Sequence, residues 1–262
     1  MRASIQLAAA ALAGLGLLSA QSVFAQSSAA PGIAGFWSPS FGGPPRGDAA
    51  ATVIADMNAR FPEGTVVLGD AGAVEYPPGE YGGLVIHEPL VAAAVDYDPR
   101  AQTTVSLTCR PPGLIYSMQG PFPIEIFTGR DIVVIKLEYF DLVRVVFMDE
   151  DAHPDNWLHS QTGHSIGHWE GDTLVVDTIA LQAGTLFNNG VDHTENVHLI
   201  ERFTPAGEDT LIVSQQFTDP DSFTGTAARI FSFSRADDHV YPYDCDPAYG
   251  IALDSVEGPG QP

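Results

Sequence analysis

Six of the eight histidines lie between His153 and His198, in a stretch that also holds two of the three tryptophans. The centre of this stretch reads Gly163-His-Ser-Ile-Gly-His-Trp-Glu-Gly-Asp-Thr-Leu-Val-Val-Asp-Thr178. Imidazoles bind metal ions and exchange protons near neutral pH, and neighbouring carboxylates tune both properties. The stretch is therefore the first candidate for a chemical site.

General acid–base chemistry requires one imidazole beside a carboxylate and within reach of a substrate proton. His193 lies between two acidic residues at the end of a long loop, and we expect it to act as the general base or acid. We expect His164 to be its partner and Asp177 or Glu201 to orient one of the imidazoles. His153 is a further candidate.

These residues also have structural explanations. Asp177 follows Leu-Val-Val in a predicted strand, and a buried carboxylate at that position needs a partner. The partner is Arg144 or Arg202 in the structural explanation and a histidine in the catalytic one. His198 fits a half-buried strand histidine, and Glu201 fits a charge at the rim of a sheet.

A metal centre is an alternative that the spacing does not favour. His164 and His168 share one face of a predicted strand, but the strand rise puts their Cα atoms about 13 Å apart. The helical His-Glu-x-x-His arrangement is absent from the sequence. A metal site would need convergence of residues such as His153, His164 and His193. We expect no organic cofactor, because glycine-rich phosphate loops and dinucleotide fingerprints are absent.

A nucleophilic serine is also disfavoured. The stretch Gly163-His-Ser-Ile-Gly167 matches the Gly-x-Ser-x-Gly string of serine hydrolases. That motif places its serine on a sharp turn between a strand and a helix. Ser165 instead lies in or beside a predicted β-hairpin, which lacks such a turn.

The elements that would position these side chains are mostly short strands. Helical spacing of apolar residues predicts a helix over 48–61 and a second, short helix over 88–97. Further along, β-branched runs alternate with turns at 124–127, 132–137, 142–148, 164–169, 173–178, 197–204, 210–218 and 229–234. These sequential hairpins predict a mainly β fold. We expect an antiparallel meander that closes into a lipocalin-like barrel or half-barrel, with one or two short N-terminal helices.

The N-terminus predicts export. Residues 1–25 combine a positive start, an apolar stretch and a small-residue cleavage site before Gln26, which is typical of a signal peptide. An uncleaved N-terminal anchor is the alternative. We expect residues 26–47 to form an extended N-terminal arm and 48–262 to form a single β-rich domain. The mature protein would then be periplasmic or secreted.

Charge and cysteine content limit the partners. The formal net charge of −22 repels phosphate backbones and anionic lipid, so we expect no nucleic acid and, after signal cleavage, no membrane partner. A small-molecule ligand or substrate remains, and the oligomeric state stays open. In an oxidising compartment Cys109 and Cys245 are expected to form a disulfide, with two buried thiols as the alternative.

The central block resembles a large family of exported bacterial proteins of uncharacterised function, which carry a Gly-His/Tyr-Ser-Ile-Gly-x-Trp-Glu-Gly-Asp-Thr-Leu-Val-Val-Asp-Thr run. The likeness extends to Gly35-Phe-Trp37, Cys109-Arg-Pro-Pro-Gly113, Asp192-His193-Thr-Glu195, His198-Leu-Ile-Glu-Arg-Phe203 and Cys245. Family members often have Arg at the position of His168, and a His-Glu-Gly-Asn-Tyr run where this chain has Asp246-Pro-Ala-Tyr249. The resemblance implies export, one domain and the Cys109–Cys245 pairing.

Together these observations favour an exported, cofactor-independent lyase, hydratase or isomerase. It would use histidine and carboxylate chemistry on a small apolar or aromatic molecule held in an apolar pocket with a few polar groups. Two alternatives stay open. One is a non-catalytic periplasmic protein that binds a similar ligand, and the other is a histidine-ligated metalloenzyme.

Overall fold

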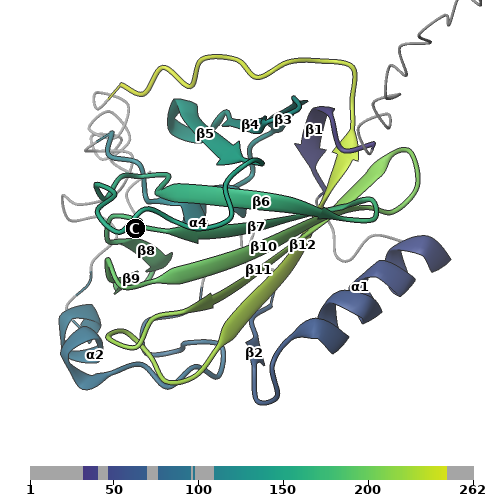
Figure 1. Cartoon of the computed structure of the whole chain (residues 1–262). Coiled ribbons are helices and arrows are strands. Elements are labelled where there is room, and N and C mark those ends of the chain that lie inside the picture. Colours follow the sequence, from purple (N-terminus) through teal and green to yellow (C-terminus); the bar gives the residue numbers. More distant parts are fainter. Residues whose placement is uncertain (1–31, 41–46, 70–75, 96, 98–108, 247–262) are drawn as a thin grey trace, which may run out of the picture.

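Nine strands close into a β-barrel in the computed structural model (Figure 1). The structure describes residues 32–40, 47–69, 76–95, 97 and 109–246, so the predicted signal peptide lies outside the described residues. In order around the barrel the strands are β1 (Gly35–Pro39), β3 (Ile124–Thr128), β4 (Ile132–Leu137), β5 (Leu142–Phe147), β6 (His164–Glu170), β7 (Thr173–Ile179), β10 (His198–Pro205), β11 (Thr210–Thr218) and β12 (Ala227–Arg235). The mainly β barrel with short helices is thus confirmed.

Successive strands pair as the turn residues predict. β3 and β4, β6 and β7, and β10 and β11 form antiparallel hairpins. In the β6–β7 turn Gly171 has φ 62°, a conformation that glycine adopts without steric cost. One step differs from the expected meander, because β5 and β6 run parallel. Parallel neighbours need a long return connection, and residues 148–163 supply it.

The N-terminal arm closes the ring. β1 pairs with β3 on one side and with β12 on the other. Trp37 in this strand is fully buried, and its indole N–H donates to Ile33 O at 2.7 Å. The guanidinium of Arg235 lies over the Trp37 ring, 4.1 Å from its centroid. This part of the arm is therefore a barrel strand.

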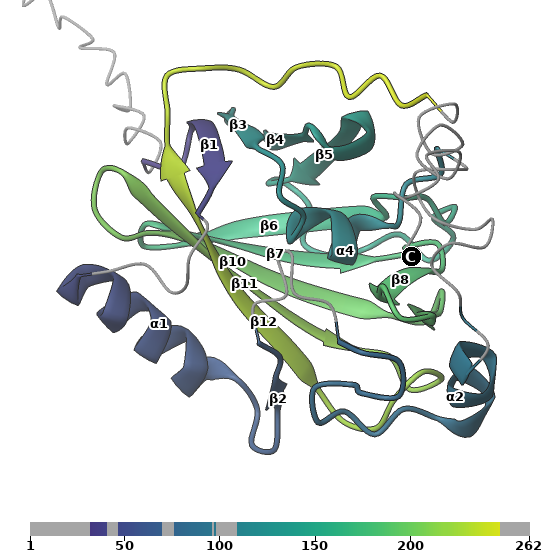
Figure 2. The ribbon, with the colours of Figure 1, turned by 180° about the vertical axis from the view of Figure 1, so that it is seen from behind.

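Small elements cover the outside of the barrel and fill its interior. Helix α1 (Asp48–Arg60) packs on the outer face of β11, where Met57 meets Ile212 (Figure 1). The 88–97 prediction corresponds to α2 (Glu88–Val95). A helix that the sequence did not indicate, α4 (Leu114–Met118), lies between the β3–β5 and β6–β7 strands and is buried (Figure 2). Short strands β2 (Val66–Val67), β8 (Gly184–Phe187) and β9 (Val191–His193) complete the set.

A disulfide fastens the segment that follows β12. Cys109 and Cys245 are bonded, with Cα atoms 5.7 Å apart, which confirms the predicted pairing. Residues 236–246 run across the molecule toward this bond (Figure 1), and on the way Tyr243 packs against Tyr139 and Phe140. None of the helices in the described parts of the chain is long and apolar enough to cross a membrane.

Candidate functional site

Three adjacent strands present polar side chains to the outside of the barrel wall. Side chains alternate between the two faces of a strand, and Leu199 and Glu201 point into the barrel, where both are fully buried. His198 therefore points outward on β10. Asp177 on β7 and His164 on β6 lie on the same outer face, close enough for their side chains to be linked.

The connection from β5 to β6 completes this cluster by folding back over the outer face. His153 in this connection lies with Nδ1 2.8 Å from Nδ1 of His164 and with Nε2 3.3 Å from Oδ1 of Asp177. His198 Nε2 lies 2.6 Å from the same Asp177 oxygen. At the other end, Glu150 Oε2 lies 3.2 Å from His164 Nε2. These contacts form one continuous series, which we call the histidine cluster: Glu150, His164, His153, Asp177 and His198.

Aromatic rings enclose one end of the histidine cluster. The ring of Phe147 stacks on His164 with centroids 5.1 Å apart, and Trp157 meets the same imidazole at 4.4 Å. The side chain of His164 is 0% exposed, whereas that of His198 is 43% exposed. Ligands from solvent can therefore reach His198 directly, whereas His164 is covered by its neighbours.

The Asp177 carboxylate assigns one proton on each of two imidazoles. A carboxylate only accepts, so His153 and His198 both donate to Asp177 from Nε2. The 2.8 Å contact between Nδ1 of His153 and Nδ1 of His164 holds one proton, which either ring can carry. Nε2 of His164 faces the Glu150 carboxylate. Nδ1 of His198 has no recorded partner within the described residues, so its lone pair is available to a ligand.

The surroundings shift the pKa values of His198 and His164 in opposite directions. The hydrogen bond to Asp177 raises the pKa of His198 above its usual 6.5, and partial burial opposes this only in part. Burial lowers the pKa of His164, although Glu150 acts the other way. Burial alone would raise the pKa of Asp177, but its bonds to His198 and His153 outweigh that and lower it. Such a split in pKa values separates a group that takes protons from one that stays neutral.

His193 lies elsewhere, so the expected partnership with His164 is not formed. It sits in β9, where it is buried, and its Nδ1 donates to Thr194 O at 3.0 Å. Burial lowers the pKa of this imidazole. A side chain that is 1% exposed is closed to a substrate from solvent.

Glu201 does not orient a histidine either. It forms an ion pair with Arg144 inside the barrel, where both side chains are 0% exposed. Arg144 also donates to Ser165 and Thr178, and Gln215 donates to Glu201 at 3.0 Å. The expected rim charge is wrong: this buried network explains Glu201, and it also accounts for Ser165. The carboxylate that contacts histidines is Asp177, as the catalytic interpretation of that residue requires.

The sequence therefore indicated His153, His164 and Asp177 but not the other two members of the cluster. His198 had the stronger signal, because it lies on the outward face of a strand that pairs with the Asp177 strand. Glu150 had only a weak one, since it belongs to an acidic run in a connection without regular structure.

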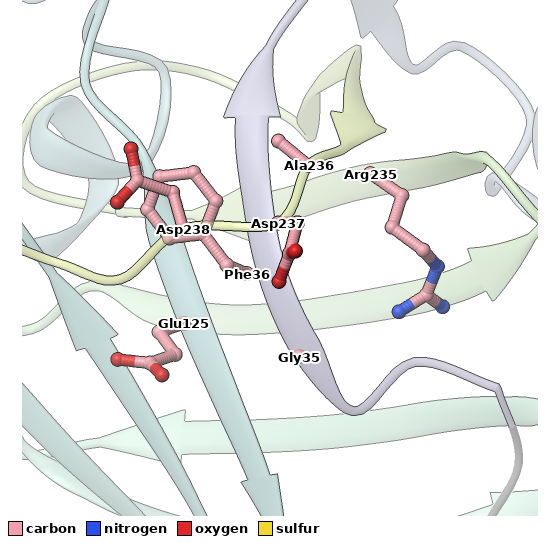
Figure 3. Close-up of a pocket in the computed structure, with 7 residues that line it drawn as sticks. All are labelled: Gly35, Phe36, Glu125, Arg235, Ala236, Asp237 and Asp238. Atoms are coloured by element: carbon pink, nitrogen blue, oxygen red, sulfur yellow. The ribbon is translucent and has the colours of Figure 1, made fainter.

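A separate hollow of about 490 Å³ lies between β1, β3 and the segment after β12 (Figure 3). Glu125, Asp237 and Asp238 line it, and Phe36 lies among them. The guanidinium of Arg235 is turned to backbone carbonyls, including that of Ala34 at 2.9 Å. None of its lining residues belongs to the histidine cluster, and an acidic hollow by itself defines no ligand.

Comparisons of the chain with protein-family models, with curated proteins and with solved structures found no match. Among the described residues, no three side chains of His, Cys, Asp or Glu are arranged to hold a metal ion. The chemistry of the histidine cluster is therefore inferred from its own geometry.

Proposed function

We propose that the protein is an exported, acid–base enzyme of the lyase, hydratase or isomerase type, acting on a small, largely apolar molecule. The observation that supports this most is the His198–Asp177 pair, in which a carboxylate holds Nε2–H and leaves Nδ1 open. A carboxylate that orients an imidazole in this way fixes its tautomer and stabilises the imidazolium that forms when the ring takes a proton.

In the proposed reaction His198 Nδ1 removes a proton from a carbon next to a carbonyl group. The C–H electrons move toward the carbonyl oxygen and form an enolate, and the proton stays on His198. The same imidazolium then returns the proton to carbon or protonates a leaving hydroxyl at the β position. His153 keeps its hydrogen bond to Asp177 throughout, and His164 positions His153 from below.

Exchange of carbon-bound protons with solvent tests this reaction without knowledge of the natural substrate. The protein is incubated in D₂O with a panel of small aliphatic and aromatic ketones and enones, and deuterium uptake is followed by NMR. We expect exchange with wild-type protein and a loss of at least about a hundredfold in His198→Gln. His168→Gln is the matched control, since His168 is an exposed histidine of β6 that contacts Glu170 instead of the cluster.

The proposal fails if wild-type protein exchanges no ketone faster than free imidazole does, or if His198→Gln exchanges as fast as wild type. A second candidate, a binding protein without turnover, is favoured by the complete burial of His164. It predicts ligand binding without deuterium uptake. A metal ion at this site would have to replace the hydrogen bond between His153 and His164.

A further inference from the structure

The outer face of the barrel beside the histidine cluster is apolar. Side chains that alternate with the core residues of β4, β5 and β6 form what we call the apolar strip: Ile132, Val134, Val143, Val145, Phe147 and Ile166. Val143 is 52% exposed, Ile132 41% and Val145 38%. Contiguous apolar surface is uncommon on a protein with a large net charge, and where it occurs it often marks a binding site.

One row of this strip leads directly to the Asp177 carboxylate, which positions His198. Ile132 lies opposite Phe147, Phe147 lies opposite Ile166, and Ile166 lies opposite Asp177. Three strand spacings separate Ile132 from Asp177, which is roughly 14 Å. The row is therefore continuous with the histidine cluster, and Phe147 belongs to both because it also stacks on His164.

We propose that the apolar strip holds the hydrocarbon chain of the substrate while its carbonyl end meets His198. This inference rests on the proposed function and narrows the substrate to an uncharged compound with an extended apolar chain. The six strip side chains carry no charge, and Lys136, which lies opposite Val143, is at the end of the strip away from Ile132. Glu150 and Asp177 at the cluster repel anions. A span of roughly 14 Å matches about twelve bonds of an extended chain.

The test is a binding series of straight-chain 2-ketones, from heptan-2-one to tridecan-2-one, followed by tryptophan fluorescence, since Trp157 lies beside Phe147. A fully buried methylene tightens binding about fourfold, so on an open face we expect roughly two- to fourfold per methylene up to about twelve bonds. Decanoate should bind more weakly than undecan-2-one because the carboxylates of Glu150 and Asp177 at the cluster repel its own carboxylate.

The variant Ile132→Thr with Val145→Thr should flatten this dependence on chain length. Both side chains are exposed, and threonine keeps the β-branched shape, so the barrel should remain folded. Val85→Thr is the matched control, because Val85 is exposed and lies outside the strip. Unchanged dependence in the double variant, or no dependence in wild type, would overturn the inference.

Two further outcomes would also overturn it. Self-association of the wild-type protein that disappears in the double variant, without ketone binding, would make the strip a contact between copies of the chain. Flotation of wild-type protein with neutral phosphatidylcholine vesicles, without ketone binding, would make it a lipid contact. Chain-dependent binding without deuterium uptake would contradict the proposed reaction alone, and uptake without chain dependence would contradict the strip alone.

Discussion

At the scale of single residues, Asp177 determines what the histidine cluster can do. A single carboxylate oxygen, Oδ1, accepts hydrogen bonds from two imidazoles, so it holds a proton on Nε2 of each ring. Because the carboxylate lies on the outer face beside His198, it keeps that imidazole protonated to a higher pH than a free histidine. The buried His164, by contrast, loses its proton more easily than a free histidine.

We expect Asp177→Asn to lower the pKa of His198 to about the ordinary histidine value of 6.5 or below. A raised folded-state pKa contributes stability that is present below 6.5 and is lost as the pH rises through the folded pKa. The loss of stability in Asp177→Asn should therefore be largest between the pKa of Asp177, which lies below 3.8, and that of His198. NMR titration of the imidazoles and urea unfolding at several pH values measure both effects.

The matched control is Asp172→Asn, which removes a carboxylate from the β6–β7 turn. An unchanged titration of His198 in Asp177→Asn would show that the hydrogen bond does not raise its pKa. His164 titrates on the other side of 6.5, and its lowered pKa works against stability as the pH falls. Comparison of each variant with wild type at the same pH removes this opposing contribution.

At the scale of the elements, local patterns predicted the hairpins but could not predict how distant elements meet. The β6–β7 hairpin follows from alternating residues around a glycine turn, and α1 follows from helical spacing. Helix α4 has five residues after a Pro-Pro-Gly break, so its stability comes from burial and not from its own sequence. The link between His153 and Asp177 likewise depends on a long connection, which sequence spacing does not reveal.

The strand β6 contains a glycine that its neighbours require. A Cβ atom on Gly167 would lie 2.6 Å from Val146 Cγ1 and 2.9 Å from Met148 Sδ. Val146 is a fully buried core residue, so it cannot move aside at low cost. We expect Gly167→Ala to lower the free energy of unfolding by about 1–3 kcal/mol through overpacking, as measured by urea denaturation.

Gly32→Ala is the control for this substitution, because a Cβ atom there meets nothing within 4 Å. Its free energy of unfolding should stay within about 0.5 kcal/mol of the wild-type value. Equal stability of the two alanine variants would mean that β5 and β6 can separate to accommodate the methyl group.

At the scale of the whole molecule, two long-range links hold together segments from the early and late parts of the described chain. β1 inserts between β3 and β12, and the Cys109–Cys245 bond ties the segment after β12 to the region before α4. Both links join residues that are far apart in sequence. The disulfide persists in the unfolded chain and reduces its conformational freedom, whereas the β1 pairing forms only on folding.

Breaking the disulfide should destabilise the protein by about 2–5 kcal/mol, because the bond closes a long loop in the unfolded chain. The two cysteines are separated by 136 residues. Urea unfolding with and without a reductant measures the effect, and the Cys109→Ser, Cys245→Ser double variant should not respond to the reductant. Identical unfolding midpoints for wild type in the two conditions would contradict this expectation.

The odd number of strands in the barrel has a consequence for where chemistry can be placed. Around a closed ring, strand direction can alternate at every step only if the strand count is even. With nine strands the ring must contain a parallel step, and this one falls between β5 and β6. The chain must then travel back along the barrel, and here the return runs outside the wall and carries Glu150, His153 and Trp157 onto the outward faces of β6 and β7. The parity of the barrel thus requires the long connection whose outer course completes the histidine cluster on the flank of the barrel.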